Sequence, residues 1–406
     1  MRVLIADKLP DHAVISLQTA GMEVRLQPSA SGDTLLAALQ EFRPEVLVVR
    51  STEVDASHLA VGSLGLVVRA GAGVNTIDVA SAAASGIYVA NCPGKNSLAV
   101  AELAIGLLVS LDRRIPDAVA ELRAGRWCKG EYSKAEGLAG RTLGVLGGGR
   151  IGVAVARRAV AMDMRVLVWD RGESARAEVT AAGATYWDGT LAELLPQCDA
   201  VTLHLPATAE TRGLAGPEFF GALKPGAFFL NTSRAELVDE AALLSAIDDK
   251  GLRAAVDVFR GEGEGKAGDV DSALLRSPSV IATPHIGAST EQAQDAVAAE
   301  AARIVRAYAD GSPVPHVVNV TERRPASHVL VVRHLNRVGV LSHVFSALKD
   351  AQINAEETEN IVFDGGRACI ARVAIDRPPE HGVLERIAAG CPDILAINLA
   401  ALGARS

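Results

Sequence analysis

The sequence is poor in cysteine and has no long apolar run. Its five cysteines are odd in number and never spaced as CxxC, which is typical of reduced thiols and indicates neither a disulfide framework nor a metal site. No window approaches the roughly 18 uninterrupted apolar residues that a membrane-spanning helix needs. A strand-like run begins at Arg2, with no charged and then apolar leader before it. We therefore expect a cytoplasmic protein without a metal and without a membrane anchor.

A basic surface is absent as well. The formal net charge is −8, whereas a nucleic-acid-binding surface needs a basic footprint, so we expect no nucleic-acid partner. A small anionic substrate is still compatible with this charge, because a few local arginines can outweigh the overall balance. Hydrophobic residues make up 49% and charged residues 22% of the chain, which is the composition of a folded protein. At 406 residues the chain is too long for one ordinary core, so two or three domains are expected.

The pattern of apolar runs predicts an α/β fold with two lobes. In residues 1–92 short apolar runs alternate with helical stretches, which is the rhythm of βα units in a parallel sheet. A second series of this kind begins at Thr142. Between them, a stretch from Asn96 that is apolar nearly all round predicts a buried helix. A long amphipathic helix over 289–309 opens with a Ser-Thr cap signal, and we expect it to return the chain to the first lobe.

These patterns divide the chain into domains. Residues 1–95 and 289–312 are predicted to form a discontinuous substrate-binding domain, and residues 96–288 a Rossmann domain, each built on a doubly wound parallel sheet. Residues 313–326 contain prolines and a charge cluster and indicate a linker. Residues 327–406 read as β, α, β, β, α and β in order, which is a ferredoxin-like pattern.

A glycine-rich turn predicts a dinucleotide site. Gly147, Gly149 and Gly152 form GxGxxG directly after an apolar strand and at the start of a helix, where a pyrophosphate meets free N–H groups and the positive end of the helix dipole. For such a motif alone, a glycine turn without a ligand is the alternative. Asp170 ends the next strand, and a carboxylate there can accept both ribose hydroxyls of NAD and repels the phosphate of NADP. The cofactor is therefore predicted to be NAD, although the neighbouring Arg171 could meet the phosphate of NADP.

Three later strand ends each carry an ionisable residue. In a doubly wound sheet the carboxyl ends of the strands converge on the ligand crevice, so Arg234, Glu262 and His285 are candidates for one site. Hydride transfer to a 2-oxo acid needs a cation for the carboxylate, which suits Arg234. It also needs an acid for the ketone oxygen, which suits His285, and a carboxylate that raises the pKa of that histidine, which suits Glu262. Each residue alone is more often a structural or solvated charge, and only their joint arrangement favours an enzyme.

Seven segments resemble the D-isomer-specific 2-hydroxyacid dehydrogenase family. In order they are RAGAGVNTIDV (69–79), NCPGKNSLAVAELA (91–104), LGVLGGGRIG (143–152), HLPATAETRGL (204–214), LNTSRAELVDE (230–240), AAVDVFRGE (254–262) and TPHIGAST (283–290). The resemblance covers residues 1 to about 312. It implies that Arg234, Glu262 and His285 are the catalytic triad and that a homodimer forms through the cofactor lobe. It also implies contacts with the cofactor from Arg150, Ile151, Asp170, His204, Leu205, Thr232, Asp257, Gly287 and Ala288.

One position departs from the family. The family usually has Glu-Pro after DVFxx, whereas Gly263 follows Glu262 here and Glu264 lies close by. The carboxylate that faces His285 is therefore left open between Glu262 and Glu264.

The first lobe carries an arginine pattern. VVRST (48–52) and RAGAG (69–73) resemble the members of the family that act on phosphoglycerate more closely than glyoxylate or lactate reductases. Arginines can hold a phosphate and a glycine-rich turn can offer N–H groups to a carboxylate, while a surface contact is the alternative. The candidates for substrate contact are Arg50, Ser51, Arg69, Ala72, Gly73, Asn96 and Gln294. Lys129 or Lys134 could reach a phosphate from the partner subunit.

The resemblance implies NAD-dependent oxidation of 3-phospho-D-glycerate to 3-phosphohydroxypyruvate, the first step of serine synthesis, with His285 as acid and base. A glyoxylate or hydroxypyruvate reductase on the same scaffold is the nearest alternative. A non-enzymatic NAD sensor, like the dehydrogenase-shaped transcriptional corepressors, is an alternative of another class. The complete Arg/Glu/His set counts against that sensor.

Residues 327–406 resemble an ACT domain, a small amino-acid-sensing module. A strand-to-helix turn near Gly339 would bring backbone N–H groups to the carboxylate of a ligand. The resemblance implies that His334, Asn336 and Asn354 bind serine as an effector and that the chain forms a homodimer or homotetramer. Val338 departs from the family, which often has proline before this glycine, and a purely structural dimerisation module is the alternative.

Overall fold

The computed structural model describes residues 1–262, 268–321 and 326–402. They divide into two compact units, Met1–Asn319 and Val320–Ser406. The first unit holds two parallel sheets and the second a small antiparallel sheet, so the predicted fold class is confirmed. Among the helices of the described residues, none is both long and apolar enough to cross a bilayer.

The first sheet has the strand order β2-β1-β3-β4-β5, with every pair parallel. Its strands are β1 (Arg2–Ile5), β2 (Glu23–Leu26), β3 (Val46–Val49), β4 (Leu66–Arg69) and β5 (Tyr88–Asn91). The helices between them are α1 (Asp11–Thr19), α2 (Gly32–Phe42), α3 (Ala56–Leu59) and α4 (Val79–Ala84). β3 is buried along its whole length, as its four consecutive apolar residues predict for a strand covered on both faces.

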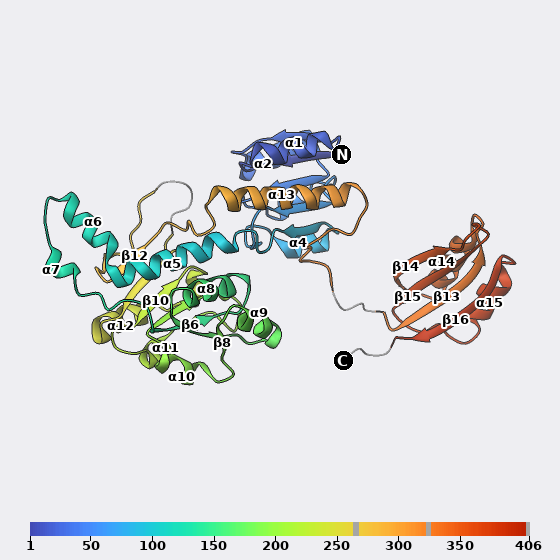
Figure 1. Ribbon diagram of the computed structural model, residues 1–406. Helices are drawn as coiled ribbons and strands as arrows, with labels where there is room; N and C mark the ends of the chain where they lie inside the picture. Colours follow the sequence, from blue (N-terminus) through green and yellow to red (C-terminus); the bar gives the residue numbers. More distant parts are fainter. Residues whose placement is uncertain (263–267, 322–325, 403–406) are drawn as a thin grey trace. The chain divides into compact units, whose positions relative to one another are not determined.

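Helix α13 (Glu291–Ala309) returns to this first sheet from far along the chain. Its apolar stripe, including Val297, Ala301 and Ile304, packs into one core with Val3 and Val46 of the sheet. Figure 1 shows α13, in orange, lying across the blue strands of the first lobe. A helix and a sheet that are at least 200 residues apart in sequence (291 − 91) therefore share one hydrophobic core.

The second sheet has the order β12-β11-β10-β9-β6-β7-β8 and is also parallel. Its strands are β6 (Thr142–Leu146), β7 (Arg165–Trp169), β8 (Thr185–Tyr186), β9 (Ala200–Leu203), β10 (Phe228–Asn231), β11 (Arg253–Val256) and β12 (Val280–Ala282). The associated helices are α5 (Ser97–Arg113), α8 (Arg150–Val160), α9 (Arg176–Ala181), α10 (Leu191–Leu194), α11 (Pro217–Ala222) and α12 (Glu240–Lys250). The helix predicted from Asn96 is α5, which packs on α8 but leaves Leu98 61% exposed, so it is not buried all round.

Two short helices, α6 (Ile115–Arg123) and α7 (Lys129–Tyr132), precede β6 and have no buried residues. Trp127, between them, is 80% exposed. Figure 1 shows this pair extending from α5, away from the second sheet.

The second unit has the predicted order β, α, β, β, α, β. Its elements are β13 (His328–Leu335), α14 (Val340–Asp350), β14 (Ala355–Val362), β15 (Ala368–Ile375), α15 (Val383–Gly390) and β16 (Ile394–Ala401). The sheet has the order β14-β15-β13-β16 and is antiparallel. Part of the segment predicted as a linker belongs to the first unit, because Asn319 accepts a hydrogen bond from Val89 N at 2.9 Å and Val317 bridges to Ala90.

Each parallel sheet has a point where the strand order reverses, and ligands of such sheets bind beside it. In the first sheet this point lies between β1 and β3, and in the second between β6 and β9. Asp7 follows β1 and its carboxylate accepts hydrogen bonds from the N–H groups of Arg50, Ser51 and Thr52, which follow β3. The expected position of a site is therefore the edge of each sheet that carries these strand ends.

Candidate active site

A cleft of about 920 Å³ lies at these strand ends in the first unit. Segments that follow β1, β3 and β4 line it, together with those that follow β10, β11 and β12 and the start of α13. All ten residues proposed from the sequence as catalytic or as substrate contacts within one subunit are among its lining residues: Arg50, Ser51, Arg69, Ala72, Gly73, Asn96, Arg234, Glu262, His285 and Gln294. The structure therefore brings together side chains that are up to 244 residues apart in the chain, from Arg50 to Gln294 (294 − 50).

His285 and Glu262 form a hydrogen-bonded pair. The Nδ1 atom of His285 lies 2.7 Å from Oε2 of Glu262, and Oε1 of Glu262 accepts a hydrogen bond from Phe259 N at 2.9 Å. The hydrogen bond to Glu262 raises the pKa of His285 above its usual value, against the opposite effect of burial. Burial opposes ionisation of Glu262, but the hydrogen bond from His285, the charge of His285 and the Phe259 N–H together outweigh it, and the pKa of Glu262 is lowered. Glu264, the alternative partner, lies outside the described residues.

The loop that carries His285 is held by Asp257, a carboxylate that is 1% exposed. Its oxygens accept hydrogen bonds from Ile286 N at 2.9 Å, from Gly287 N at 2.8 Å and from the hydroxyl of Thr283. His285 has a φ of 52°, a left-handed conformation that residues other than glycine adopt uncommonly and at a cost. Asp257 and Gly287, proposed as cofactor contacts, thus shape the loop that presents the histidine.

Three guanidinium groups converge in the cleft. Burial lowers the pKa of Arg69, and the positive charges of Arg234 and Arg50 lower it further. The Nε atom of Arg69 is buried and has no hydrogen-bond partner among the described residues. Arg234 lies against the glycine turn of the first lobe, since a Cβ added to Gly73 would stand 3.2 Å from its Nη2. The positive charges of this cluster repel one another, so binding of an anionic ligand is electrostatically favourable.

Two residues in or beside the cleft were missed by the sequence analysis. Asp7 holds the turn that carries Arg50 and Ser51, and its Oδ1 also accepts a hydrogen bond from the Ser51 hydroxyl at 2.9 Å. Lys8, which follows it, lines the cleft. The signal was present at the carboxyl end of the first strand, RVLIADK, where a parallel sheet of this topology places its ligands.

The glycine turn after β6 forms a cradle at the start of α8. Gly147 has a φ of 109°, and a Cβ there would lie 2.4 Å from the carbonyl oxygen of His204, at the point where the strand order reverses. A Cβ at Gly152 would lie 1.8 Å from the carbonyl oxygen of Gly147. Around Gly149, the N-cap of α8, no described heavy atom lies within 4 Å of the Cβ position. The turn is therefore closed on the protein side and open at the helix N-terminus, which fits a pyrophosphate.

Further candidates for cofactor contact surround this turn. The carboxylate of Asp170 accepts hydrogen bonds from Gly148 N and Gly172 N, and so faces the glycine turn. The guanidinium of Arg171 lies 3.9 Å from a carboxylate oxygen of Glu210. This pairing counters the attraction of Arg171 for a phosphate.

Two orphaned polar atoms also fit a bound dinucleotide. Thr232 Oγ1 and His204 Nδ1 are buried without a partner in the described part of the chain, and such atoms need a ligand or water to satisfy them. Burial lowers the pKa of His204 to about 3, so its imidazole is neutral.

The remaining cofactor candidates lie in the cleft, beside Pro93 or in the hydrophobic cores. Ala288 lines the cleft, and Arg150 donates a hydrogen bond from Nη1 to the carbonyl oxygen of Pro93 at 2.8 Å. Ile151 and Leu205 pack against the hydrophobic cores of the second lobe.

The three residues proposed as effector ligands all have partners inside the second unit. His334 is 2% exposed and its ring nitrogens lie 2.8 Å from Leu335 O and 3.2 Å from Asn360 Oδ1. Asn336 donates to the carbonyl oxygen of Gly366, and Asn354 donates to Glu356, which leaves these amides bonded locally.

The lysines that precede β6 lie outside the cleft lining. Lys129 begins α7, and Lys134 lies 3.9 Å from Glu131. Among the described residues there is no group of three or more His, Cys, Asp or Glu side chains that could hold a metal ion.

The two lobes, the glycine cradle and the histidine–carboxylate pair define a dinucleotide-dependent dehydrogenase. Residues 105–287 match the NAD binding domain of the D-isomer specific 2-hydroxyacid dehydrogenases. The chain belongs to the D-isomer specific 2-hydroxyacid dehydrogenase family, and its cofactor is NAD.

Individual relatives extend this similarity over most of the chain. It is 39% identical over 387 residues to a D-3-phosphoglycerate dehydrogenase of Mycobacterium tuberculosis, which covers 92% of this chain and 71% of the relative. It is 37% identical over 330 residues to a D-3-phosphoglycerate dehydrogenase of Archaeoglobus fulgidus, which covers 80% of this chain and 60% of that relative. The chain thus spans less than two thirds of the archaeal relative's length. D-mandelate dehydrogenase of Rhodotorula graminis, a solved structure, matches 79% of this chain and 98% of its own with a TM-score of 0.71 and 25% identity.

The glycine cradle predicts different effects for two substitutions. Gly147→Ala places a Cβ against backbone in a left-handed conformation, which costs about 1–3 kcal/mol, so we expect a lower Tm and weaker NAD binding. Gly149→Ala has room in the protein, so we expect a nearly unchanged Tm and a loss of NAD affinity alone, because the new methyl group enters the space of the pyrophosphate. Thermal denaturation measures the Tm of the two variants, and calorimetric titration measures their NAD affinity. A Gly147→Ala protein with the stability and affinity of the parent would contradict the proposed role of this turn.

The His285–Glu262 pair predicts a pH dependence. Since Glu262 raises the pKa of His285, the Glu262→Gln variant lowers it. Oxidation of a hydroxy acid needs the neutral imidazole, so kcat/KM rises as the pH increases through this pKa, and the midpoint moves to lower pH in the variant. Initial rates across pH test this shift. Glu236→Gln, which removes another carboxylate of the cleft, leaves the midpoint in place, and a Glu262→Gln midpoint that stays or moves upward refutes the pairing.

Proposed function

We propose that the protein catalyses the NAD-dependent oxidation of 3-phospho-D-glycerate to 3-phosphohydroxypyruvate. The observation that carries this proposal is the convergence of Arg50, Arg69 and Arg234 in one cleft with the His285–Glu262 pair. The names of the relatives from Mycobacterium tuberculosis and Archaeoglobus fulgidus agree with it. We further propose that the site residues expected from the sequence serve this reaction and that the expected domain boundaries hold, except that the first unit extends to Asn319.

The charge of the cleft favours a substrate with two anionic groups. A 2-hydroxy acid without a phosphate has one carboxylate, and a single guanidinium can bind it through two parallel hydrogen bonds. Arg234 lines the cleft with the catalytic pair and lies against the Gly73 turn, which supports a role in binding this carboxylate. Arg50 and Arg69 belong to the strand ends of the first lobe and remain for a phosphate. A phosphorylated hydroxy acid therefore neutralises all three cations.

The side chains of the cleft divide the chemistry among them. Arg234 orients the substrate carboxylate and polarises the adjacent C–O bond. His285 takes the hydroxyl proton on its Nε2 atom, since its Nδ1 is bonded to Glu262. Glu262 fixes the orientation of the ring and stabilises the imidazolium that results. When bound, NAD supplies the acceptor for the hydride, and the residues of the glycine cradle, Asp170 and Thr232 would hold it.

The second unit is proposed to act as an ACT domain that binds an amino acid, with serine as the candidate effector and His334, Asn336 and Asn354 near the ligand. A homodimer or homotetramer in the cytoplasm is the proposed working form. In that assembly Lys129 or Lys134 of one subunit would reach the substrate phosphate of its partner.

The proposed reaction predicts turnover with 3-phospho-D-glycerate and NAD. His285→Ala removes the proton acceptor, so kcat falls by a factor on the order of 10²–10⁴ while NAD still binds. His12→Ala removes a half-exposed histidine on α1 and serves as the control, with no expected change. NADH formation followed by absorbance checks both variants. A parent protein that binds NAD but turns over no 2-hydroxy acid would instead favour the non-enzymatic sensor.

Arg50 predicts the preference for a phosphate. In the Arg50→Ala variant KM for 3-phospho-D-glycerate rises about tenfold or more, since a charge-assisted contact is lost, while KM for an unphosphorylated 2-hydroxy acid hardly changes. Steady-state kinetics on both substrates measure this difference. An equal rise of KM for the two substrates would show that Arg50 does not bind the phosphate.

A further inference from the structure

The segment Cys92–Asn96 carries the chain from β5 of the first sheet to α5 of the second lobe. Cys92 N donates to the carbonyl oxygen of Gly71 at 2.9 Å, so the segment begins against the glycine turn of the cleft. At its other end Asn96 lines the cleft, and its Oδ1 is buried without a partner among the residues described. The conformation of this segment therefore decides how Asn96 meets a ligand.

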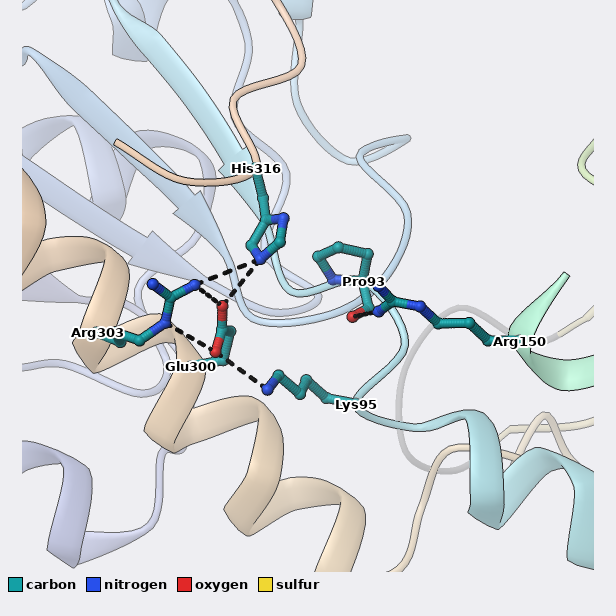
Figure 2. Close-up of polar contacts among 6 residues, drawn as sticks. All are labelled: Pro93, Lys95, Arg150, Glu300, Arg303 and His316. Atoms are coloured by element: carbon teal, nitrogen blue, oxygen red, sulfur yellow. Dashed lines mark hydrogen bonds and ion pairs between the residues drawn. The ribbon is translucent and has the colours of Figure 1, made fainter. Parts of the chain in front are cut away.

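Glu300 holds this segment from α13. Its side chain is 5% exposed and its carboxylate contacts three basic side chains, at 3.1 Å from Lys95 Nζ, 2.5 Å from Arg303 Nη2 and 3.0 Å from His316 Nε2 (Figure 2). The hydrogen bond from Arg303 lowers the pKa of Glu300 to about 2 against the effect of burial, and the bond from Lys95 adds to it. A buried carboxylate of this kind needs its partners, because an unpaired buried charge is costly.

The three basic side chains come from three segments. Arg303 is one helical turn away on α13 itself, and His316 lies on the segment after that helix. Lys95 alone among the three belongs to the segment that carries Asn96, and it is the residue directly before it. The contact between Glu300 and Lys95 thus couples the position of Asn96 to that of α13.

The same segment is tied from the second lobe. Arg150, at the start of α8, donates to the carbonyl oxygen of Pro93 at 2.8 Å (Figure 2). The Arg150 side chain packs against Gly94, because a Cβ added to Gly94 would lie 2.2 Å from Arg150 Nη1. Gly94 also has a φ of 78°, which favours glycine. The turn is therefore held by α13 at Lys95 and by the nucleotide-binding helix at Pro93.

We propose that Glu300 is a positioning residue of the active site, which holds Lys95 and through it the turn that presents Asn96 to the substrate. The proposal rests on the proposed function, since Asn96 is there a substrate contact. Glu300 is not among the residues that line the cleft, and it contacts the turn directly through Lys95. A purely structural salt bridge would contribute stability without changing the affinity for the substrate.

The test compares variants that each remove one partner of Glu300. Lys95→Met cuts the tie to the turn, and Arg303→Met is the matched control that removes a cation from the helix side only. In Lys95→Met and in Glu300→Gln we expect KM for the hydroxy acid to rise about tenfold. The dissociation constant of NAD is expected to stay within about twofold of the parent value. Lys95→Arg should restore KM, and Lys95→Met combined with Glu300→Gln should be no worse than Glu300→Gln alone.

Hydrogen–deuterium exchange over residues 91–97 provides a readout that does not need turnover. Exchange should increase in Lys95→Met and Glu300→Gln and stay near the parent level in Arg303→Met. Unchanged exchange in the first two variants, or an equal rise of KM in Arg303→Met, overturns the proposal. A parent protein that is inactive on every hydroxy acid rejects the proposed function instead, and the exchange data then still decide whether Glu300 holds the turn.

Discussion

The buried carboxylate of Asp257 is the constraint on which the arrangement of the active site depends. By accepting hydrogen bonds from Ile286 N and Gly287 N it closes the loop after β12 and keeps His285 at a φ of 52°. Residues other than glycine adopt this conformation uncommonly and at a cost, which the hydrogen bonds to Asp257 offset here. Gly287 is required beside it, since a Cβ there would lie 2.9 Å from the carboxylate. The imidazole then meets Glu262 on the loop after β11, and the pair acquires the raised pKa of His285 that acid–base chemistry uses.

In the first lobe the carboxylate of Asp7 likewise holds a loop through backbone N–H groups. Asp7 accepts the N–H groups of Arg50, Ser51 and Thr52, as Asp257 does for its own loop. Burial opposes ionisation of Asp7, but these hydrogen bonds outweigh it and the pKa of Asp7 is lowered, so the carboxylate stays charged. Carboxylates thus fix the backbone on both sides of the cleft, and the guanidinium groups of Arg50, Arg69 and Arg234 line it. This division explains how a chain of net charge −8 presents a cationic cleft.

Local patterns predicted the parts whose conformation depends on neighbours in the sequence. Gly147 and Gly152 follow a strand and begin a helix, so their close contacts could be expected from spacing alone. The strand ends that carry Arg234, Glu262 and His285 were predictable for the same reason. Asp257 and Arg150 were proposed as cofactor contacts, but their side chains bond to a loop and to Pro93. Asp7 and Glu300 were missed, because a carboxylate that binds distant N–H groups or cations has no pattern of its own.

The sequence by itself determined the fold class, the dinucleotide turn and the identity of the ionisable residues, since each follows from the alternation of apolar residues or from a short motif. Only the tertiary structure decided which of these residues meet. Three contacts join separate segments of the chain. His285 pairs with Glu262, Arg234 approaches Gly73, and Glu300 binds Lys95. Such contacts follow from the return of α13 to the first sheet and from the order of the strands, because packing brings distant segments within bonding distance where sequence spacing cannot.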